Sequence, residues 1–137
     1  MLGVMALFAL WGTWSQNVAY FANGGGPAAF GAFVVDAKVN AASRSLGVDI
    51  AVVFYAACVF MVIEARKLGV RFVWAYVILG LLIAISVTFP LFLIARERRL
   101  ASGARASGAE PGATDVAGLA LLALVTIGLS LYVVGVV

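Results

Sequence analysis

The chain has 137 residues, of which 65% are hydrophobic and 11% are charged, against about 45–50% and about 25% in soluble domains. With a mean hydropathy of +1.15, this composition excludes a soluble domain of useful size and indicates an integral membrane protein, with one domain over residues 1–137. The net charge of +3 does not indicate nucleic-acid binding, because the basic residues flank apolar segments. With one cysteine and no histidine, we expect neither a metal site nor a cofactor.

The first apolar run predicts a transmembrane helix over residues 2–21. It has no basic start and no small-residue cleavage site near its end, so it is not typical of a secretory signal. Its second half carries Gln16 and Asn17, two polar candidates for a binding site. Three glycines and Pro27 follow and end the helix, because none of them continues a helix cheaply.

Residues 28–44 are too short and too interrupted to cross a bilayer. Their apolar positions recur with the period of a helix, which gives one apolar face. The residues on that face are Phe30, Phe33, Val34, Ala37 and Ala41. We expect a short interfacial or re-entrant helix here, with Pro27 in its first turn.

The second span is predicted over residues 45–64, with Ser45 as the N-cap and Asp49 four residues on. The short basic connection over residues 65–71 then joins it to a third span as an antiparallel pair.

The third span is predicted over residues 72–95, which carry no charge. At about 1.5 Å per residue the 24 residues between Arg71 and Arg96 extend about 36 Å, enough to cross a hydrocarbon core of about 30 Å. Pro90 has no N–H to give the carbonyl of Ser86, so we expect a kink there. Small residues at every fourth position predict a helix-packing groove. These residues are Gly80, Ala84 and Thr88.

A polar linker over residues 100–114 is rich in Ala, Gly and Ser, and we expect it to be flexible and to take no part in chemistry. An uncharged fourth span follows over residues 116–137. The predicted fold is therefore an all-α membrane protein with four transmembrane helices and one short interfacial or re-entrant helix. With this topology the positive-inside tendency favours both termini outside, whereas the density of Arg66, Lys67 and Arg71 in the second connection favours the opposite orientation.

Asp49 is the first candidate for chemistry, because an ionised carboxylate in the hydrocarbon region costs several kcal/mol and usually has a partner or a function. One interpretation is a proton-handling or ligand-binding acid. The other, which we favour, is a helix N-terminal acid that reaches the headgroups or pairs with Arg44 or Lys38.

Glu64 is the second candidate acid. The favoured interpretation is a salt bridge to Lys67 three residues on, which contributes a few tenths of a kcal/mol at most. The alternative is an anchor for a polar headgroup, shared with Arg66 and Arg71. We assign no catalytic residue.

Several strings resemble an uncharacterised family of small bacterial integral membrane proteins, a domain of unknown function frequent in actinobacteria. The strings are TWSQNVAYF (13–21), DAKVNAASRS (36–45) with VDI (48–50), EARKLGVRFVWAY (64–76) and ISVTFPLFLIARE (85–97). The resemblance covers about residues 10–100, and its most specific part is Phe-Pro-Leu-Phe-Leu-x-x-Arg, which ends at Arg96. It implies a multi-span protein of the bacterial cell membrane without an assigned activity. Its marked positions are Asp49, Glu64, Pro90 and Arg96.

Three functions are compatible with these patterns. The favoured one is an accessory subunit that packs against a larger membrane protein complex or a second copy of itself, through the Gly80 face of the third span and through the fourth span. The second is a lipid- or isoprenoid-binding protein, including a cofactor-free isomerase or cyclase with Asp49 and Glu64 as acid and base. The third is a small transporter or channel, for which we find no internal repeat. The expected partners are the bilayer, other subunits and a bound lipid.

Overall fold

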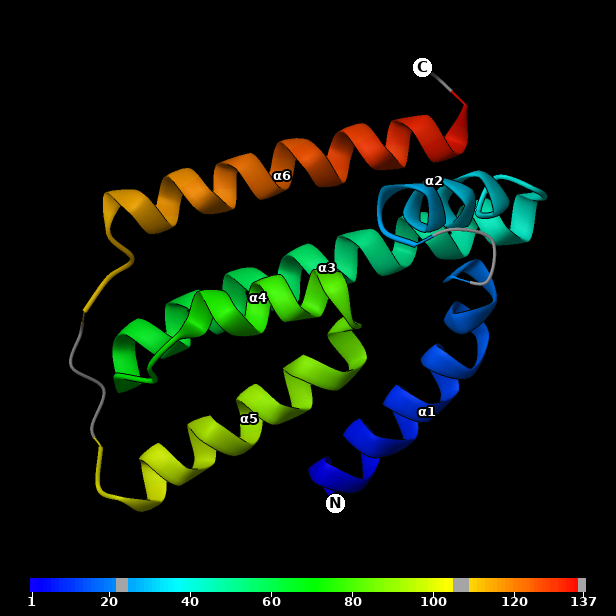
Figure 1. Cartoon of the computed structure of the whole chain (residues 1–137). Helices are drawn as coiled ribbons and strands as arrows, with labels where there is room; N and C mark the ends of the chain where they lie inside the picture. Colours follow the sequence, from blue (N-terminus) through cyan, green and yellow to red (C-terminus); the bar gives the residue numbers. More distant parts are fainter. Residues whose placement is uncertain (22–24, 105–108, 136–137) are drawn as a thin grey trace.

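The computed structural model describes residues 1–21, 25–104 and 109–135, and these residues form helices joined by short turns (Figure 1). These residues form six helices and no strand. The helices are α1 (Leu2–Phe21), α2 (Pro27–Asp36), α3 (Ala41–Leu68), α4 (Val73–Leu82), α5 (Ile85–Ala101) and α6 (Ala113–Val134).

The first two helices agree in part with the expectation. Helix α1 has the bounds predicted for the first span; of the glycines expected to end it, Gly24 lies outside the described residues. Helix α2 begins with Pro27 in its first turn, as predicted, but it ends at Asp36. The expected range of 28–44 is therefore wrong at its C-terminal end, because residues 37–40 form a turn before α3.

Helix α3 begins four residues earlier than predicted. Asn40, not Ser45, is the N-cap, and its side-chain oxygen accepts a hydrogen bond from the Ser43 N–H at 2.8 Å. The helix runs for 28 residues, about 42 Å, and ends at Leu68, followed by Gly69 in the left-handed conformation. Asp49 therefore lies two turns inside the helix and not in its first turn.

The predicted third span is not a single helix. Helix α4 ends at Leu82 and α5 begins at Ile85, with Ala84 in an extended conformation between them. The two helices fold back on each other as a hairpin, which Figure 1 shows in green. The interruption lies at residues 83–84, whereas the kink was expected at Pro90, which is inside α5. As a result both ends of the segment 72–95 lie at the same end of α3.

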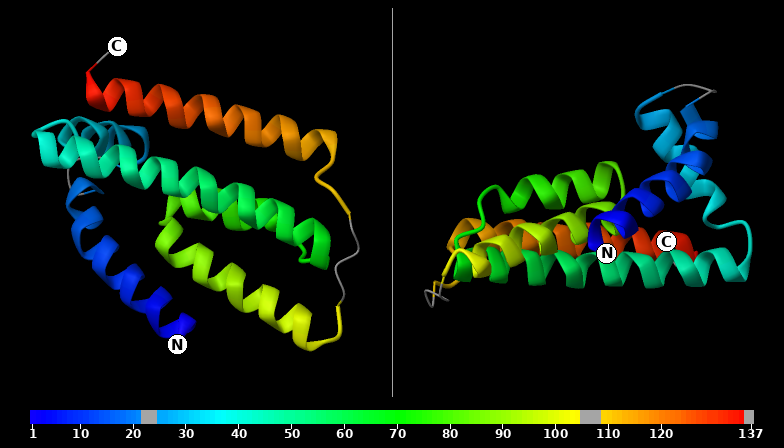
Figure 2. Two further views of the ribbon diagram at one scale, coloured as in Figure 1. Left: turned by 180° about the vertical axis from the view of Figure 1, so that it is seen from behind. Right: turned by 90° about the horizontal axis from the view of Figure 1, so that it is seen from below.

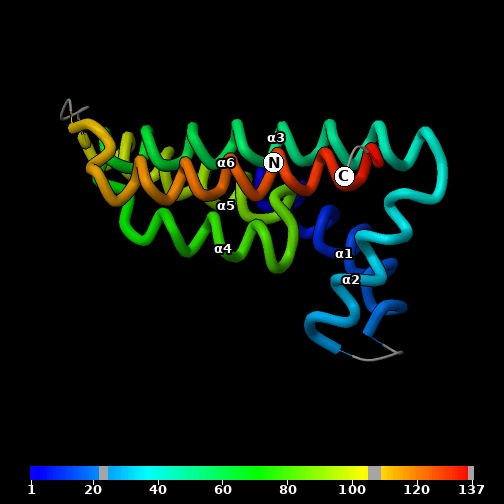
Figure 3. Tube along the Cα trace, turned by 90° about the horizontal axis from the view of Figure 1, so that it is seen from above, coloured from blue at the N-terminus to red at the C-terminus, as the bar shows by residue number. Residues whose placement is uncertain are grey.

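The helices are arranged around α3 in an open layer. Helices α6, α3 and α5 lie side by side, and α4 packs against one face of α3 and α5 (Figure 2 and Figure 3). Helix α1 packs against α5 and α2. The core lies where α3, α4 and α5 meet, and its largest fully buried side chains are Phe92, Met61, Val62 and Cys58. No described helix covers the face of the layer opposite α4 in these views.

By length and composition, two of the described helices can cross a membrane, α3 and α6, where the sequence predicted four spans. Gln16 and Asn17 lower the hydropathy of α1, and the hairpin divides the third span into two shorter pieces. Helix α6 begins at Ala113, before the predicted start at residue 116, so it includes Asp115. The expected linker of 100–114 is shortened at both ends, and residues 105–108 of it are outside the described part.

Candidate functional site

The hairpin gathers most of the described charges at one end of the molecule, which we call the charged end. Helices α3 and α5 end there and α6 begins there. Cations occupy the last turns of α3 and α5, and Asp115 occupies the first turn of α6. The cations therefore lie at the negative ends of the α3 and α5 dipoles, and Asp115 lies at the positive end of the α6 dipole. The charged residues of this end are Glu64, Arg66, Lys67, Arg71, Arg96, Glu97, Arg98, Arg99, Glu110 and Asp115.

Asp115 is the most completely bonded acid of the charged end. Its carboxylate accepts two hydrogen bonds of 2.7 Å from Arg66 and one of 2.9 Å from the indole N–H of Trp74. The backbone N–H of Gly112 donates to it at 3.1 Å. The Asp115 side chain is 5% exposed and that of Arg66 is 42% exposed. A buried carboxylate with four donors links α3, α4 and the start of α6.

The Trp74 ring also packs directly on α6. At Gly118, one turn after Asp115, a Cβ atom would lie 2.5 Å and 2.7 Å from two ring carbons of Trp74. Real Cβ atoms do not approach other atoms so closely, so this position accommodates the ring because it is glycine. The hydrogen bond and the packing together fix α6 against α4.

Glu64 and Arg96, both candidates from the sequence, are brought together by the fold. Arg96 Nε donates to Glu64 Oε2 at 2.8 Å, and Arg96 Nη1 donates to Glu97 Oε1 at 2.7 Å. The expected contact of Glu64 with Lys67 is present at 4.0 Å. The hydrogen bond to Glu64 raises the pKa of Arg96 above its ordinary value, so this guanidinium remains charged.

The other polar candidates do not join this cluster. Asp49 is exposed on α3, fifteen residues before Glu64, which is about 22 Å along the helix axis. Within the described residues Asp49 makes no hydrogen bond or ion pair, so the expected pairing with Arg44 or Lys38 is wrong. Arg44 instead donates to the Lys38 carbonyl at 2.9 Å. Gln16, on α1, donates to the neighbouring Ser15, and neither it nor Asn17 bonds to Asp49. Asp49 and Glu64 are thus too far apart to act on the same atom of a substrate.

The small residues of the predicted groove lie on both sides of the hairpin. A Cβ atom at Gly80 would lie 2.9 Å from Thr88 Oγ1 and 3.5 Å from Phe54 of α3. Ala84 is in the turn, Ser86 lies in the first turn of α5, and Pro90 lies in the second. Gly80 and Thr88 therefore face each other inside this chain, where their small size allows α4 and α5 to approach.

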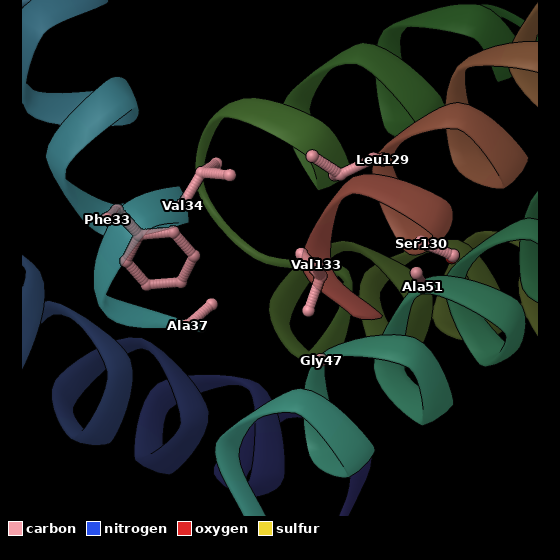
Figure 4. A pocket seen from close by; sticks show the side chains of 8 residues that line it. All are labelled: Phe33, Val34, Ala37, Gly47, Ala51, Leu129, Ser130 and Val133. Carbon is pink, nitrogen blue, oxygen red and sulfur yellow. The ribbon is translucent and has the colours of Figure 1, made fainter. Parts of the chain in front are cut away.

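A small apolar crevice lies away from the charged end, between α2, α3 and α6 (Figure 4). Its volume of about 80 Å³ is well below the roughly 300–1,000 Å³ of ligand pockets. The hydroxyl of Ser130, which lines it, donates to the carbonyl of Thr126 at 2.8 Å. Close by, the Lys38 ammonium lies 3.8 Å from the centre of the Tyr132 ring. The crevice is a packing seam between helices.

A comparison with models of protein families identifies the family of this chain. A family model described as protein of unknown function DUF2834 matches residues 1–98. The chain belongs to this family. No curated protein and no solved structure matches it. The family match includes Glu64, Arg66 and Arg96, whereas α6 with Asp115 lies beyond it.

Sequence reasoning missed the Arg66–Asp115–Trp74 cluster. The predicted linker ends at residue 114 and the predicted fourth span begins at residue 116, where the apolar run starts, so Asp115 is assigned to neither. The available signal was an acid directly before a long uncharged run, which is the position of a first-turn helix acid. The partners of this acid are far away in sequence, so no local pattern names them.

Proposed function

We propose that the protein is a multi-pass protein of the bacterial cell membrane, in which α3 and α6 cross the bilayer and the α4–α5 hairpin enters and leaves from one side. The length and composition of α3 and α6 support the crossing. With ten residues α4 extends about 15 Å, which is half of a hydrocarbon core of about 30 Å. The Lys and Arg residues of the charged end favour the cytoplasmic side for that end.

In this placement Asp49 lies inside the hydrocarbon region. If Glu64 marks the cytoplasmic boundary, Asp49 is about 22 Å from that boundary in a core of about 30 Å, which places it about 8 Å inside the opposite boundary. Its side chain is exposed among apolar neighbours on the same face of α3, which we call the Asp49 face. The residues of this face are Leu46, Asp49, Val53, Ala56 and Phe60. Aspartate is too short to reach far toward the headgroups, so a lipid-facing position would cost several kcal/mol.

We propose that the Asp49 face packs against another membrane protein, which makes this chain an accessory subunit of a larger complex. The observation that carries the proposal is the exposed Asp49 carboxylate at this depth. A partner helix with a basic or hydrogen-bond-donating side chain would compensate it. A symmetric pairing through the centre of this face would place two Asp49 carboxylates together, so a different protein fits better than a second copy.

Catalysis by Asp49 and Glu64 as an acid–base pair is less favoured. Their separation and the ion pair of Glu64 with Arg96 both argue against it.

Site-specific photo-crosslinking in cells tests the proposed function. A photoreactive residue at Leu46 or Val53, both exposed on the Asp49 face, is expected to capture one and the same membrane protein, whereas the control at Leu124, exposed on α6, is not. Asp49→Leu is expected to reduce the crosslink at least about tenfold, the change that about 1.4 kcal/mol of binding free energy produces, and Glu110→Gln to leave it unchanged. Equal crosslinking from Leu124, or an Asp49→Leu crosslink as strong as that of the unmodified chain, would overturn the proposal.

A further inference from the structure

Three acids of the charged end are paired with only two of its arginines. Asp115 is bound by Arg66, and Glu64 and Glu97 are both bound by Arg96. Three exposed arginines remain without a carboxylate partner among the described residues. These are Arg71, Arg98 and Arg99.

One of these three arginines, Arg99, joins α5 to the α3–α4 turn. Arg99 Nε donates to the backbone carbonyl of Leu68 at 3.2 Å. A Cβ atom at Gly69 would lie 2.9 Å from Arg99 Nη2, so the glycine leaves room for the guanidinium. Arg71 follows two residues later in the same turn, and Arg98 precedes Arg99 on α5. The contact of Arg99 therefore holds the last turns of α5, which carry Arg98 and Arg99, beside the turn that carries Arg71.

Phe72 lies in the same turn and leaves its ring uncovered by the rest of the protein. It is 80% exposed, and it is the only non-glycine among the described residues with a positive φ, of 59°. Bulky residues adopt this left-handed conformation rarely, and such strained positions cluster at functional sites. An exposed apolar ring beside arginines is typical of elements that lie at the boundary of acyl chains and headgroups.

We propose that Arg71, Arg98 and Arg99 bind the phosphate groups of acidic phospholipids, with Phe72 inserted among the acyl chains next to them. Guanidinium groups match phosphate oxygens in geometry as well as charge. The inference goes beyond the accessory role and rests on the proposed membrane placement, which puts these residues at the cytoplasmic leaflet. It needs no protein partner.

The test measures lipid preference of the purified full chain in mild detergent. Native mass spectrometry counts bound phosphatidylglycerol and phosphatidylcholine of identical acyl chains, and inorganic phosphate is the second probe. A basic residue near an acidic membrane surface contributes about fivefold in affinity. We expect the Arg71→Gln/Arg98→Gln variant to lose about 25-fold of the preference for phosphatidylglycerol, which is the product of two such contributions. Arg71→Lys/Arg98→Lys is expected to keep a preference, because the charge remains.

The matched control removes two positive charges from the opposite end, as Lys38→Gln/Arg44→Gln, and is expected to keep the full preference. Equal affinity of the unmodified chain for both lipids, or unchanged preference in Arg71→Gln/Arg98→Gln, would overturn the proposal. Release of the lipid by equimolar inorganic phosphate would overturn the assignment to a lipid. Failure of the membrane placement would appear separately, as protein that stays soluble without detergent, and Asp49→Leu tests the accessory role without touching these arginines.

Discussion

Arg66 and Asp115 are 49 positions apart in the chain, and their side chains meet in two parallel hydrogen bonds of 2.7 Å. Arg66 belongs to the last turn of α3 and Asp115 to the first turn of α6. Trp74 of α4 donates a third hydrogen bond to the same carboxylate. This ion pair therefore ties the start of α6, the helix beyond the family match, to α3 and α4.

Asp115→Asn is expected to loosen this docking. The variant keeps the size of the side chain but loses the charge that Arg66 neutralises. Because Arg66 is partly exposed, we expect a loss of about 1–2 kcal/mol in the free energy of unfolding, in the range of charged hydrogen bonds screened by solvent. Thermal denaturation in detergent measures it. Glu110→Gln is the control, and equal stability of the two variants would contradict the prediction.

Gly118→Ala is expected to displace Trp74. The new methyl group would lie 2.5 Å from the ring, so the ring or the helix must shift, at a cost of about 1–3 kcal/mol. Gly128→Ala is the matched control on α6, because a Cβ atom there would meet nothing within 4 Å. The control is expected to be neutral or slightly stabilising. Fluorescence of Trp74 and thermal denaturation distinguish the two, and identical behaviour of both variants would refute this packing.

Glu64 and Arg96 are expected to be energetically coupled. A double-mutant cycle with Glu64→Gln and Arg96→Gln should give a coupling energy of about 0.5–2 kcal/mol, because the pair is partly buried between α3 and α5. The control cycle of Arg96 with Glu97, whose side chain is 61% exposed, should give less, about 0–1 kcal/mol. Additive single effects for Glu64 and Arg96 would show that the ion pair does not stabilise the fold.

The hairpin predicts that Phe72 and Arg98 lie on the same side of the membrane. In a Cys58→Ala background, a membrane-impermeant maleimide should label Phe72→Cys and Arg98→Cys from one side and Ala42→Cys, at the start of α3, from the other. Cys58 itself is fully buried, so its replacement removes only background labelling. Labelling of Phe72→Cys and Arg98→Cys from opposite sides is the outcome expected of a single third span.

The helices with one clear apolar run are predicted well from their residues. The bounds of α1 follow from its apolar run and the glycines after it, and the place of Pro27 in α2 follows from its fixed φ. The start of α3 is missed, because Ser45 and Asn40 are both acceptable N-caps. In the structure Asn40 has the extended conformation and the bond to Ser43 that an N-cap needs.

For the candidate site, the sequence predicts some of the individual residues but not the contacts between them. Glu64 and Arg96 are both named from the sequence, but their pairing depends on the return of α5 to the end of α3. Asp115 is missed, since its side-chain partners come from the segment 64–76 and not from its own surroundings. The role of Asp49 stays a prediction, which the crosslinking experiment addresses.

The sequence by itself determined the helical class and the apolar character of this protein, because helix periodicity and composition are local properties. Only the tertiary structure decided that residues 72–95 turn back. The turn at Ile83 and Ala84 contains neither glycine nor proline, so no local signal marks it. Gly80 allows Thr88 and Ile85 to pack against α4 while Phe54 of α3 lies beside them, and this contact exists only once the chain has reversed. The same reversal brings Arg71 and Arg96 to one end, where the ion pairs and the unpaired arginines gather.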